Sequence, residues 1–297
     1  MRYFFKSIAF ILFPIFLFTA CDNSSVSPDG ELGTMHVLLT DAPGDFEHVF
    51  IDIQEVRIHR SSDAEEGESG WITINDQPMV VDLMELTNGN TDILGEEQLE
   101  PGTYSQLRLV LGPNNEFVRN GETRPLTTPS AQQSGLKLNI NAEIEGGRTY
   151  TLLLDFDASR SIVEAGNSGN VLLKPVIRAV NLAETGAIGG TIEPADAQPW
   201  IYAIVEEDTI AGTRASEEGE FLIIGLQTGT YQLSVLPNEE EFNSVVIPNI
   251  QVTAPDTTFL DPITLNAADG DNGDNGDNDD DGDNGDNDDN GDNGDNS

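Results

Sequence analysis

The stretch HVFIDIQEVRIHR, residues 48–60, decides the fold class of this chain of 297 residues. In its first half, three aliphatic residues at every second position share one face of an extended strand: Val49, Ile51 and Ile53. From Val56 onward the apolar residues have the opposite parity. Because a change of parity needs an inserted residue, the pattern predicts a β-bulge at Gln54 and Glu55.

Seven further segments of strand length lie between residues 34 and 182, divided by clusters of Gly, Pro, Asn and Asp: TMHVLLT, WITI, MVVDL, YSQLRLVLG, GLKLNINAEI, TYTLLLDFD and VLLKPVIRAV. This succession predicts a β-sandwich over residues 34–182. One short helix is expected in ASRSIVEA, where Asp157 would cap the first turn and Gly166 would end the helix.

A second set of apolar segments begins near Gly186: AIGGTIE, WIYAIV, GEFLIIG, GTYQLSVL, SVVI, IQVT and FLDPITL. A unit of about 80 residues suits a small seven-stranded sandwich. The predicted fold class is therefore all-β, with two consecutive β-sandwich domains over residues 34–182 and 186–266 and a disordered acidic C-terminal tail.

Three tyrosines begin strands directly after a turn that contains glycine, in LEPGTY, LQTGTY and the looser IEGGRTY. A tyrosine in such a corner packs its ring and donates its hydroxyl to the backbone. We expect this structural role for Tyr104, Tyr231 and Tyr150, with stacking on a ligand as the alternative.

Several longer motifs stand out in the first half: LLTDAPGDFEHVFIDIQEVRIHR, VDLMELTNGNTDILGEEQLEPGTYSQLRLVLG, GLKLN, LLLDFDASRSIV and LKPVIR. They span nearly all of residues 34–180 and resemble domain-of-unknown-function family 4382 of bacterial envelopes. The resemblance implies a secreted or lipid-anchored β-rich protein with no established activity. In the second half, GTIEP and EEGEFLIIGLQTGTY are similar to carboxypeptidase regulatory-like modules. That similarity implies a non-catalytic prealbumin-like or carbohydrate-binding-like sandwich.

The only cysteine of the chain, Cys21, follows a basic start and an apolar run over residues 8–18. This run is about half as long as the ~20 residues of a membrane-spanning helix, so it predicts a secretory signal over residues 1–20. The stretch resembles a bacterial lipobox, with Leu17 and Phe18 near the usual leucine, and implies lipid on Cys21 followed by a flexible linker over residues 21–33. A lipid anchor predicts the cell envelope, at the outer membrane and its surface or retained at the inner membrane.

The chain carries 53 acidic and 13 basic residues, a net charge of −40. A nucleic-acid partner is excluded because phosphate binding needs a basic surface. An acid excess that extends beyond the tail keeps a protein dispersed in brine, so it indicates a salty habitat.

Candidate catalytic sets find little support. Ser134 and Lys137 have S-x-x-K spacing, but positions three apart on a strand point to opposite faces. The spacing of His36, His48 and His59 matches no zinc motif. Four aspartates either converge on a cation or serve turns and caps, and the second role is sufficient to explain them: Asp41, Asp45, Asp155 and Asp157.

Residues 267–297 are composed almost entirely of Asp, Asn and Gly, which predicts disorder. Within this tail, four carboxylates have the spacing of a calcium-binding loop: Asp277, Asp279, Asp281 and Asp288. The alternative is a weak, diffuse association of Ca²⁺ with the exposed charges.

Trp200 and Tyr202, in QPWIYA, are candidates for stacking on sugar rings, with core packing as the alternative. The sequence predicts a lipid-anchored, non-enzymatic binding or adhesion protein whose partners are the membrane and an extracellular polysaccharide or surface protein. A carbohydrate-binding accessory for glycan capture is the alternative, and a hydrolase the third hypothesis. No cofactor is expected beyond weakly bound Ca²⁺.

Overall fold

The computed structural model describes residues 30–268, except 43, 66, 68, 129–134, 167–168 and 239–240. The predicted lipidation site, the serine of the S-x-x-K pair and the predicted calcium ligands lie outside the described residues: Cys21, Ser134, Asp277, Asp279, Asp281 and Asp288. Within the described residues, no helix has the length and apolar character needed to cross a membrane.

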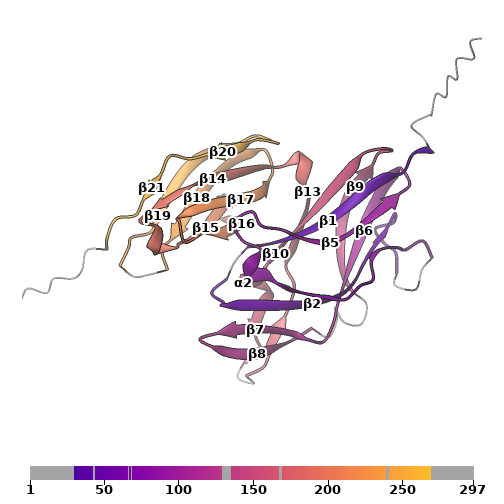
Figure 1. Cartoon of the computed structure of the whole chain (residues 1–297), viewed down its shortest axis with the longest axis horizontal. Helices are drawn as coiled ribbons and strands as arrows, with labels where there is room; N and C mark the ends of the chain where they lie inside the picture. The colour runs from indigo at the N-terminus through magenta and orange to yellow at the C-terminus, as the bar shows by residue number, and fades with distance from the viewer. Residues whose placement is uncertain are drawn as a thin grey trace, which may run out of the picture.

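The described chain forms two all-β lobes, each with a hydrophobic core (Figure 1). The first lobe consists of β1 (Gly33–Ala42), β2 (His48–His59), β3 (Ile72–Asn75), β4 (Met79–Asp82), β5 (Asp92–Leu99), β6 (Gly102–Leu111), β7 (Asn115–Arg119), β8 (Glu122–Thr127), β9 (Leu136–Ile144), β10 (Thr149–Asp157), α2 (Ala158–Ser161), β11 (Ile162–Glu164), β12 (Val171–Leu173) and β13 (Ile177–Asn181). Its smaller sheet has the order β13-β10-β1-β5. Its larger sheet has the order β11-β12-β8-β7-β2-β6-β9, and β3 and β4 also pair with β2.

The second lobe consists of β14 (Gly186–Glu193), β15 (Trp200–Val205), β16 (Asp208–Arg214), β17 (Glu220–Leu226), β18 (Gly229–Leu236), β19 (Val245–Val252), β20 (Thr257–Phe259) and β21 (Ile263–Thr264). One sheet has the order β17-β14-β20, with β21 also paired to β14, and the other has the order β16-β15-β18-β19. The predicted all-β class is confirmed.

Strand β2 has the bend that the sequence predicts. Its first-half apolar residues are all buried, and its register against β6 shifts between Ile53 and Glu55. The first half pairs with β4 and β7, and the second half pairs with β3 and β6. Because a bulge turns the strand at this point, one strand can serve two sets of neighbours while keeping its apolar side chains in the core.

The predicted helix after Asp157 is shorter than the sequence suggests. The cap is correct, since Asp157 Oδ1 accepts a hydrogen bond from the Arg160 N–H at 2.8 Å. The helix α2 ends at Ser161, however, and the next residues form β11, which pairs with β12. Ile162 and Val163 are β-branched, so a strand partner outweighs a second helical turn.

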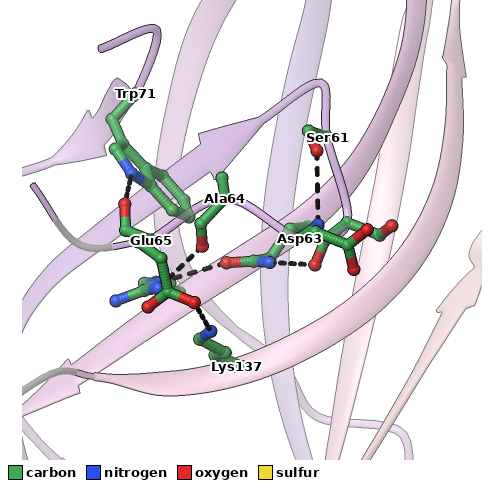
Figure 2. A network of polar contacts seen from close by, with 9 residues as sticks. Ser61, Asp63, Ala64, Glu65, Trp71 and Lys137 are labelled. Carbon is green, nitrogen blue, oxygen red and sulfur yellow. Dashed lines mark hydrogen bonds and ion pairs between the residues drawn. The ribbon is translucent and has the colours of Figure 1, made fainter. Parts of the chain in front are cut away.

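The loop between β2 and β3 is fastened to the face of the larger sheet that points away from the core (Figure 2). Arg108 of β6 is fully buried beneath it, where Nη2 donates to the Ala64 carbonyl at 2.9 Å and the guanidinium lies 4.9 Å from the centroid of Trp71. Trp71 Nε1 donates to the Glu65 carbonyl at 2.8 Å, and Lys137 Nζ lies 3.4 Å from Glu65 Oε1. Hydrogen bonds, an ion pair and the contact of Arg108 with the Trp71 ring therefore hold this loop.

The turn before β5 joins the two lobes. Asn88 donates through its backbone N–H to Thr213 Oγ1 at 2.7 Å and through Nδ2 to the Glu220 carbonyl at 3.3 Å. Gly89 has a φ of +77°, and a Cβ there would lie 2.8 Å from a Leu222 methyl group. Figure 1 shows the second lobe meeting the first at β16, close to the ends of β1 and β10. The lobes are thus in direct, hydrogen-bonded contact.

Candidate functional site

Two buried carboxylates meet at this junction because β1 and β10 are parallel, so that both strands end at the same edge. Asp41 is 2% exposed, and its Oδ1 accepts a hydrogen bond from the Ala158 N–H at 3.1 Å. Its Oδ2 has no hydrogen-bond partner in the described structure. Burial raises the pKa of Asp41 well above its ordinary value, and the nearby Asp155 and Asp157 raise it further. The site favours the protonated acid.

Asp155 is paired with Arg178, whose Nη2 lies 2.6 Å from Asp155 Oδ2. Burial raises the pKa of Asp155, and the charge of Arg178 opposes that effect. Arg178 Nη1 also donates to the carbonyl of Gly225 in the second lobe. Within the described residues, no group of three or more His, Cys, Asp or Glu side chains has a metal-binding arrangement. The aspartates here form caps and an ion pair within the first lobe, and Arg178 of that pair binds the second lobe through Gly225.

A cleft opens between the two lobes, next to the turn that carries Asn88. Its volume is about 340 Å³, and we call it the interlobe cleft. It is lined by residues from both lobes: Asp45, Phe46, Glu47, Met84, Thr87, Arg119, Asn120, Trp200, Arg214 and Asn238. Small-molecule sites have volumes of about 300–1,000 Å³, so this cleft accommodates a small ligand.

Each lobe contributes one arginine stacked on one aromatic ring to this cleft. The Arg119 Cζ lies 4.4 Å from the centroid of Phe46, and the Arg214 Cζ lies 4.8 Å from the ring of Trp200. Each Nε donates to a backbone carbonyl, that of Asp45 at 2.9 Å and that of Gln198 at 3.5 Å. Stacking and a backbone bond fix the plane of each guanidinium before any ligand arrives.

Neither cleft arginine has a carboxylate partner among the described residues. Of the nine arginines there, six form ion pairs: Arg57, Arg60, Arg124, Arg148, Arg160 and Arg178. Arg108 belongs to the buried loop network, which leaves Arg119 and Arg214. The two acids that line the cleft, Asp45 and Glu47, are exposed, and Glu47 Oε1 accepts a hydrogen bond from the backbone N–H of residue 121 at 2.9 Å. The two cleft arginines are therefore not directly paired with the acids of the lining.

The two aromatic residues singled out in the sequence lie on one face of β15 but have different surroundings. Trp200 is half-buried in the interlobe cleft, where Arg214 covers one face of its ring. Tyr202 is not part of the cleft lining and packs over Gly212, where a Cβ would lie 2.7 Å from the ring. Burial raises the pKa of Tyr202, and the charges of Asp157 and Asp41 add to the effect. Tyr202 therefore faces the junction.

The three histidines have separate partners. His36 Nε2 lies 2.7 Å from Glu96, and His48 Nδ1 lies 2.6 Å from Asp82. The ring of His59 lies 3.2 Å from the Ser69 carbonyl. Each histidine thus belongs to a local contact of the first lobe.

Sequence reasoning missed Phe46, Arg119 and Arg214. Phe46 and Arg119 lie 73 positions apart in the chain, and Arg214 belongs to the other lobe, so no local spacing connects them. The composition gave one signal: in a chain with 53 acidic and 13 basic residues, most arginines should lie near a carboxylate, so an arginine without one is unusual. Which arginines lack a carboxylate partner depends on the tertiary contacts.

Comparison with known proteins gives one family match, which covers most of the first lobe. Residues 32–175 match the family model of a domain of unknown function, DUF4382. The resemblance of the first half is thereby confirmed, while that of the second half stays a prediction. No match was found among the curated proteins.

Several solved structures are similar to parts of this chain at low sequence identity. A type II cohesin–X-dockerin complex of Acetivibrio cellulolyticus matches with 22% identity over 28% of this chain and 58% of that chain, with a TM-score of 0.23. This chain thus spans little more than half of that one. The minor pilin GBS52 of Streptococcus agalactiae matches with 11% identity over 79% of this chain and 96% of that chain, at a TM-score of 0.21. The shaft pilin SpaA of Lactobacillus rhamnosus GG matches with 9% identity over 80% and 97%, at 0.24.

Proposed function

We propose that this chain is a lipid-anchored cell-envelope protein that binds a ligand non-covalently in the interlobe cleft. The observation that carries the proposal is the pair of arginines, one from each lobe, each lying over an aromatic ring of its own lobe in a cleft of about 340 Å³. Ordered donors beside apolar ring surface are the usual composition of a small-ligand site. The anchor would be lipid on Cys21, as the leader indicates, at the outer membrane.

The side chains that line the cleft favour ligand binding over catalysis. General acid–base catalysis needs a carboxylate or imidazole placed against the reacting atoms. The only carboxylates in the lining are exposed, and Glu47 already accepts a backbone hydrogen bond. The buried acid Asp41 lies outside the lining of the cleft. A binding or adhesion protein is therefore the better reading than a hydrolase.

Carbohydrate is the ligand class that the lining favours. Thr87, Asn120 and Asn238 add uncharged hydrogen-bonding groups that suit sugar hydroxyls. Trp200 supplies an aromatic surface, and because Arg214 covers one face of the ring, a sugar ring would stack on the other. A protein partner would need a more apolar pocket to hold one of its large side chains, and the lining of this cleft mixes polar and apolar residues.

A glycan array probed with the full chain in detergent tests the proposed function. We expect binding to oligosaccharides that Trp200→Ala weakens at least about tenfold, since the ring is part of the cleft. Val163→Ala, an exposed apolar residue in β11 of the first lobe, is the control and should bind normally. Silence of the array, or full binding by Trp200→Ala, contradicts a carbohydrate site in this cleft.

The lipid anchor has its own test. Cys21→Ser removes the only thiol of the chain, so the variant should leave the membrane fraction and stay with the soluble proteins. If it still sediments with membranes, the protein is held there by something other than lipid on Cys21.

A further inference from the structure

The interlobe cleft holds two arginines for which the described structure gives no ion pair, in a chain whose net charge is −40: Arg119 and Arg214. Two exposed acids, Asp45 and Glu47, also line the cleft, so its lining is formally neutral while the whole chain is strongly acidic. A half-buried guanidinium that lacks a carboxylate in so acidic a protein is left free to bind an anion.

The geometry of the two arginines suits an anion with two acceptor oxygens. Each guanidinium lies over a ring, and each Nε donates to a carbonyl. The Arg119 side chain has no other hydrogen bond among the described residues, and the Arg214 side chain has one more, from Nη2 to Gln198 Oε1 at 3.2 Å. The remaining terminal N–H groups form a planar edge that can bind a carboxylate through two parallel hydrogen bonds, as it can a phosphate. Among sugar ligands, the uronates carry such a carboxylate.

We propose that the ligand of the interlobe cleft is an acidic glycan whose uronate carboxylates are bound by Arg119 and Arg214. The inference rests on the proposed function and adds the ligand's charge class to it. The neutral hydrogen-bonding groups of the lining would hold the ring hydroxyls, and the arginines would hold the carboxylate. Asp45 and Glu47, exposed at the rim, would repel any second acidic group that is out of register.

The experiment is titration calorimetry of the full chain in detergent with oligogalacturonide and with its methyl ester. The two probes share the same sugar ring, and the ester differs in having a neutral methyl ester group in place of each carboxylate. We expect the acid to bind about ten to a hundred times more tightly than the ester, because charge-assisted hydrogen bonds are lost on esterification. A sulfated galactan oligosaccharide and a penta-glutamate peptide are the further probes, and both should bind more weakly than the uronate.

The variants Arg119→Gln and Arg214→Gln should each weaken binding of the acid by about tenfold and leave binding of the ester unchanged. Arg148→Gln is the matched control, because Arg148 is exposed and paired with Glu145 at 2.8 Å. Arg119→Lys and Arg214→Lys keep the charge but lose the planar edge, so they should recover only part of the affinity. An unchanged midpoint of thermal unfolding shows that each variant is folded.

Three outcomes overturn the inference: equal affinity for acid and ester, tighter binding of sulfate or peptide than of uronate, or no binding of the acid at all. In the first case, weakened binding of both probes by Trp200→Ala would leave the proposed function intact. If the glycan array is silent as well, the proposed function fails together with the inference.

Discussion

Two tyrosines of the chain perform the same structural task in different lobes. Tyr104 is fully buried and donates its hydroxyl to the Glu100 carbonyl at 3.1 Å, and Tyr231 donates to the Gln227 carbonyl at 2.9 Å. In both, the acceptor lies four residues upstream, across the glycine turn. Tyr150 differs, since its hydroxyl lies 3.5 Å from the Asn141 carbonyl of β9, in the other sheet of the lobe, and this contact is exposed. The predicted corner is confirmed for the first two only.

Removing the hydroxyl group of each tyrosine tests whether the corner hydrogen bond of Tyr104 and Tyr231 stabilises the fold more than the exposed contact of Tyr150 does. Tyr104→Phe and Tyr231→Phe should each lower the free energy of unfolding by about 1 kcal/mol, because a part-buried carbonyl loses its donor. Tyr150→Phe is the matched control and should change it by less than about 0.5 kcal/mol. Urea unfolding of the full chain measures all three, and a loss for Tyr150→Phe equal to the others would contradict the distinction.

Asp41 predicts a pH dependence of stability. Its pKa is raised in the folded chain by burial and by Asp155, Asp157 and Asp82, so the folded state binds its proton more tightly than the unfolded state. The stabilisation that the protonated Asp41 gives the folded state is fully present below the pKa of Asp41 in the unfolded chain. It is lost as the pH rises through the pKa of Asp41 in the folded chain. Arg178, the cation at this junction, pairs with Asp155.

Asp41→Asn keeps the acceptor for the Ala158 N–H and removes the titration. As the pH rises from 4 to 8, the native chain loses the stabilisation from the protonated Asp41, and the variant does not. The free energy of unfolding of the variant should therefore rise relative to that of the native chain, by roughly 1.4 kcal/mol for each unit by which the pKa of Asp41 is higher in the folded than in the unfolded state. Urea unfolding at several pH values measures this difference. A stability difference that is constant with pH would show that Asp41 titrates normally in the folded protein.

At the scale of elements, a network of polar contacts attaches the loop between β2 and β3 to the larger sheet. Arg108 is fully buried on the face of β6 opposite the core, where Ala64, Gln106 and Trp71 surround it. The network in Figure 2 connects this loop to β6 and, through Lys137, to β9. A buried charge of this kind is stable only while all its partners stay in place.

Arg108→Met tests that network. The substitution preserves much of the side-chain volume but leaves the Ala64 carbonyl and Gln106 Oε1 without a donor, so it should cost about 2–4 kcal/mol of unfolding free energy. Arg148→Met, in an exposed ion pair, should change the stability by less than about 1 kcal/mol. Hydrogen exchange should also show faster exchange in the loop of the Arg108 variant. Unaltered stability and exchange would mean that the loop is held by other contacts.

At the scale of the whole molecule, a small number of contacts couples the lobes. Arg178 connects Asp155 in the first lobe to the Gly225 carbonyl in the second, and the Asn88 turn binds β16 and β17. Gly225 has a φ of +73°, and a Cβ there would lie 2.9 Å from a Leu153 methyl group, so glycine allows the backbones to approach. The interlobe cleft depends on this arrangement, because its two arginines come from different lobes.

Arg178→Gln is expected to uncouple the lobes. It leaves Asp155 buried without its cation and removes the hydrogen bond to Gly225, so the first lobe should lose about 3–5 kcal/mol. Scanning calorimetry should show one transition for the native chain and two for the variant, with ligand binding in the cleft weakened. Arg160→Gln, an exposed arginine of the same lobe, is the control. A single unshifted transition in Arg178→Gln would contradict coupling through this residue.

The sequence by itself determined the all-β class, the bulge in β2, the cap at Asp157 and two tyrosine corners, because each depends on residues within a few positions of one another. It also indicated the resemblance of residues 34–180 to a known family, for the same reason of contiguous motifs. The length of α2 was decided by the pairing of β11 with β12, and the contact of Tyr150 by the packing of β9 and β10 from two different sheets. Only the tertiary structure brings Arg119 and Phe46 together with Arg214 and Trp200, since the partner of a charge depends on which distant carboxylates lie within reach. Local sequence patterns determine the strands and turns. The contacts between the two lobes determine which arginines line the cleft and lack a carboxylate partner.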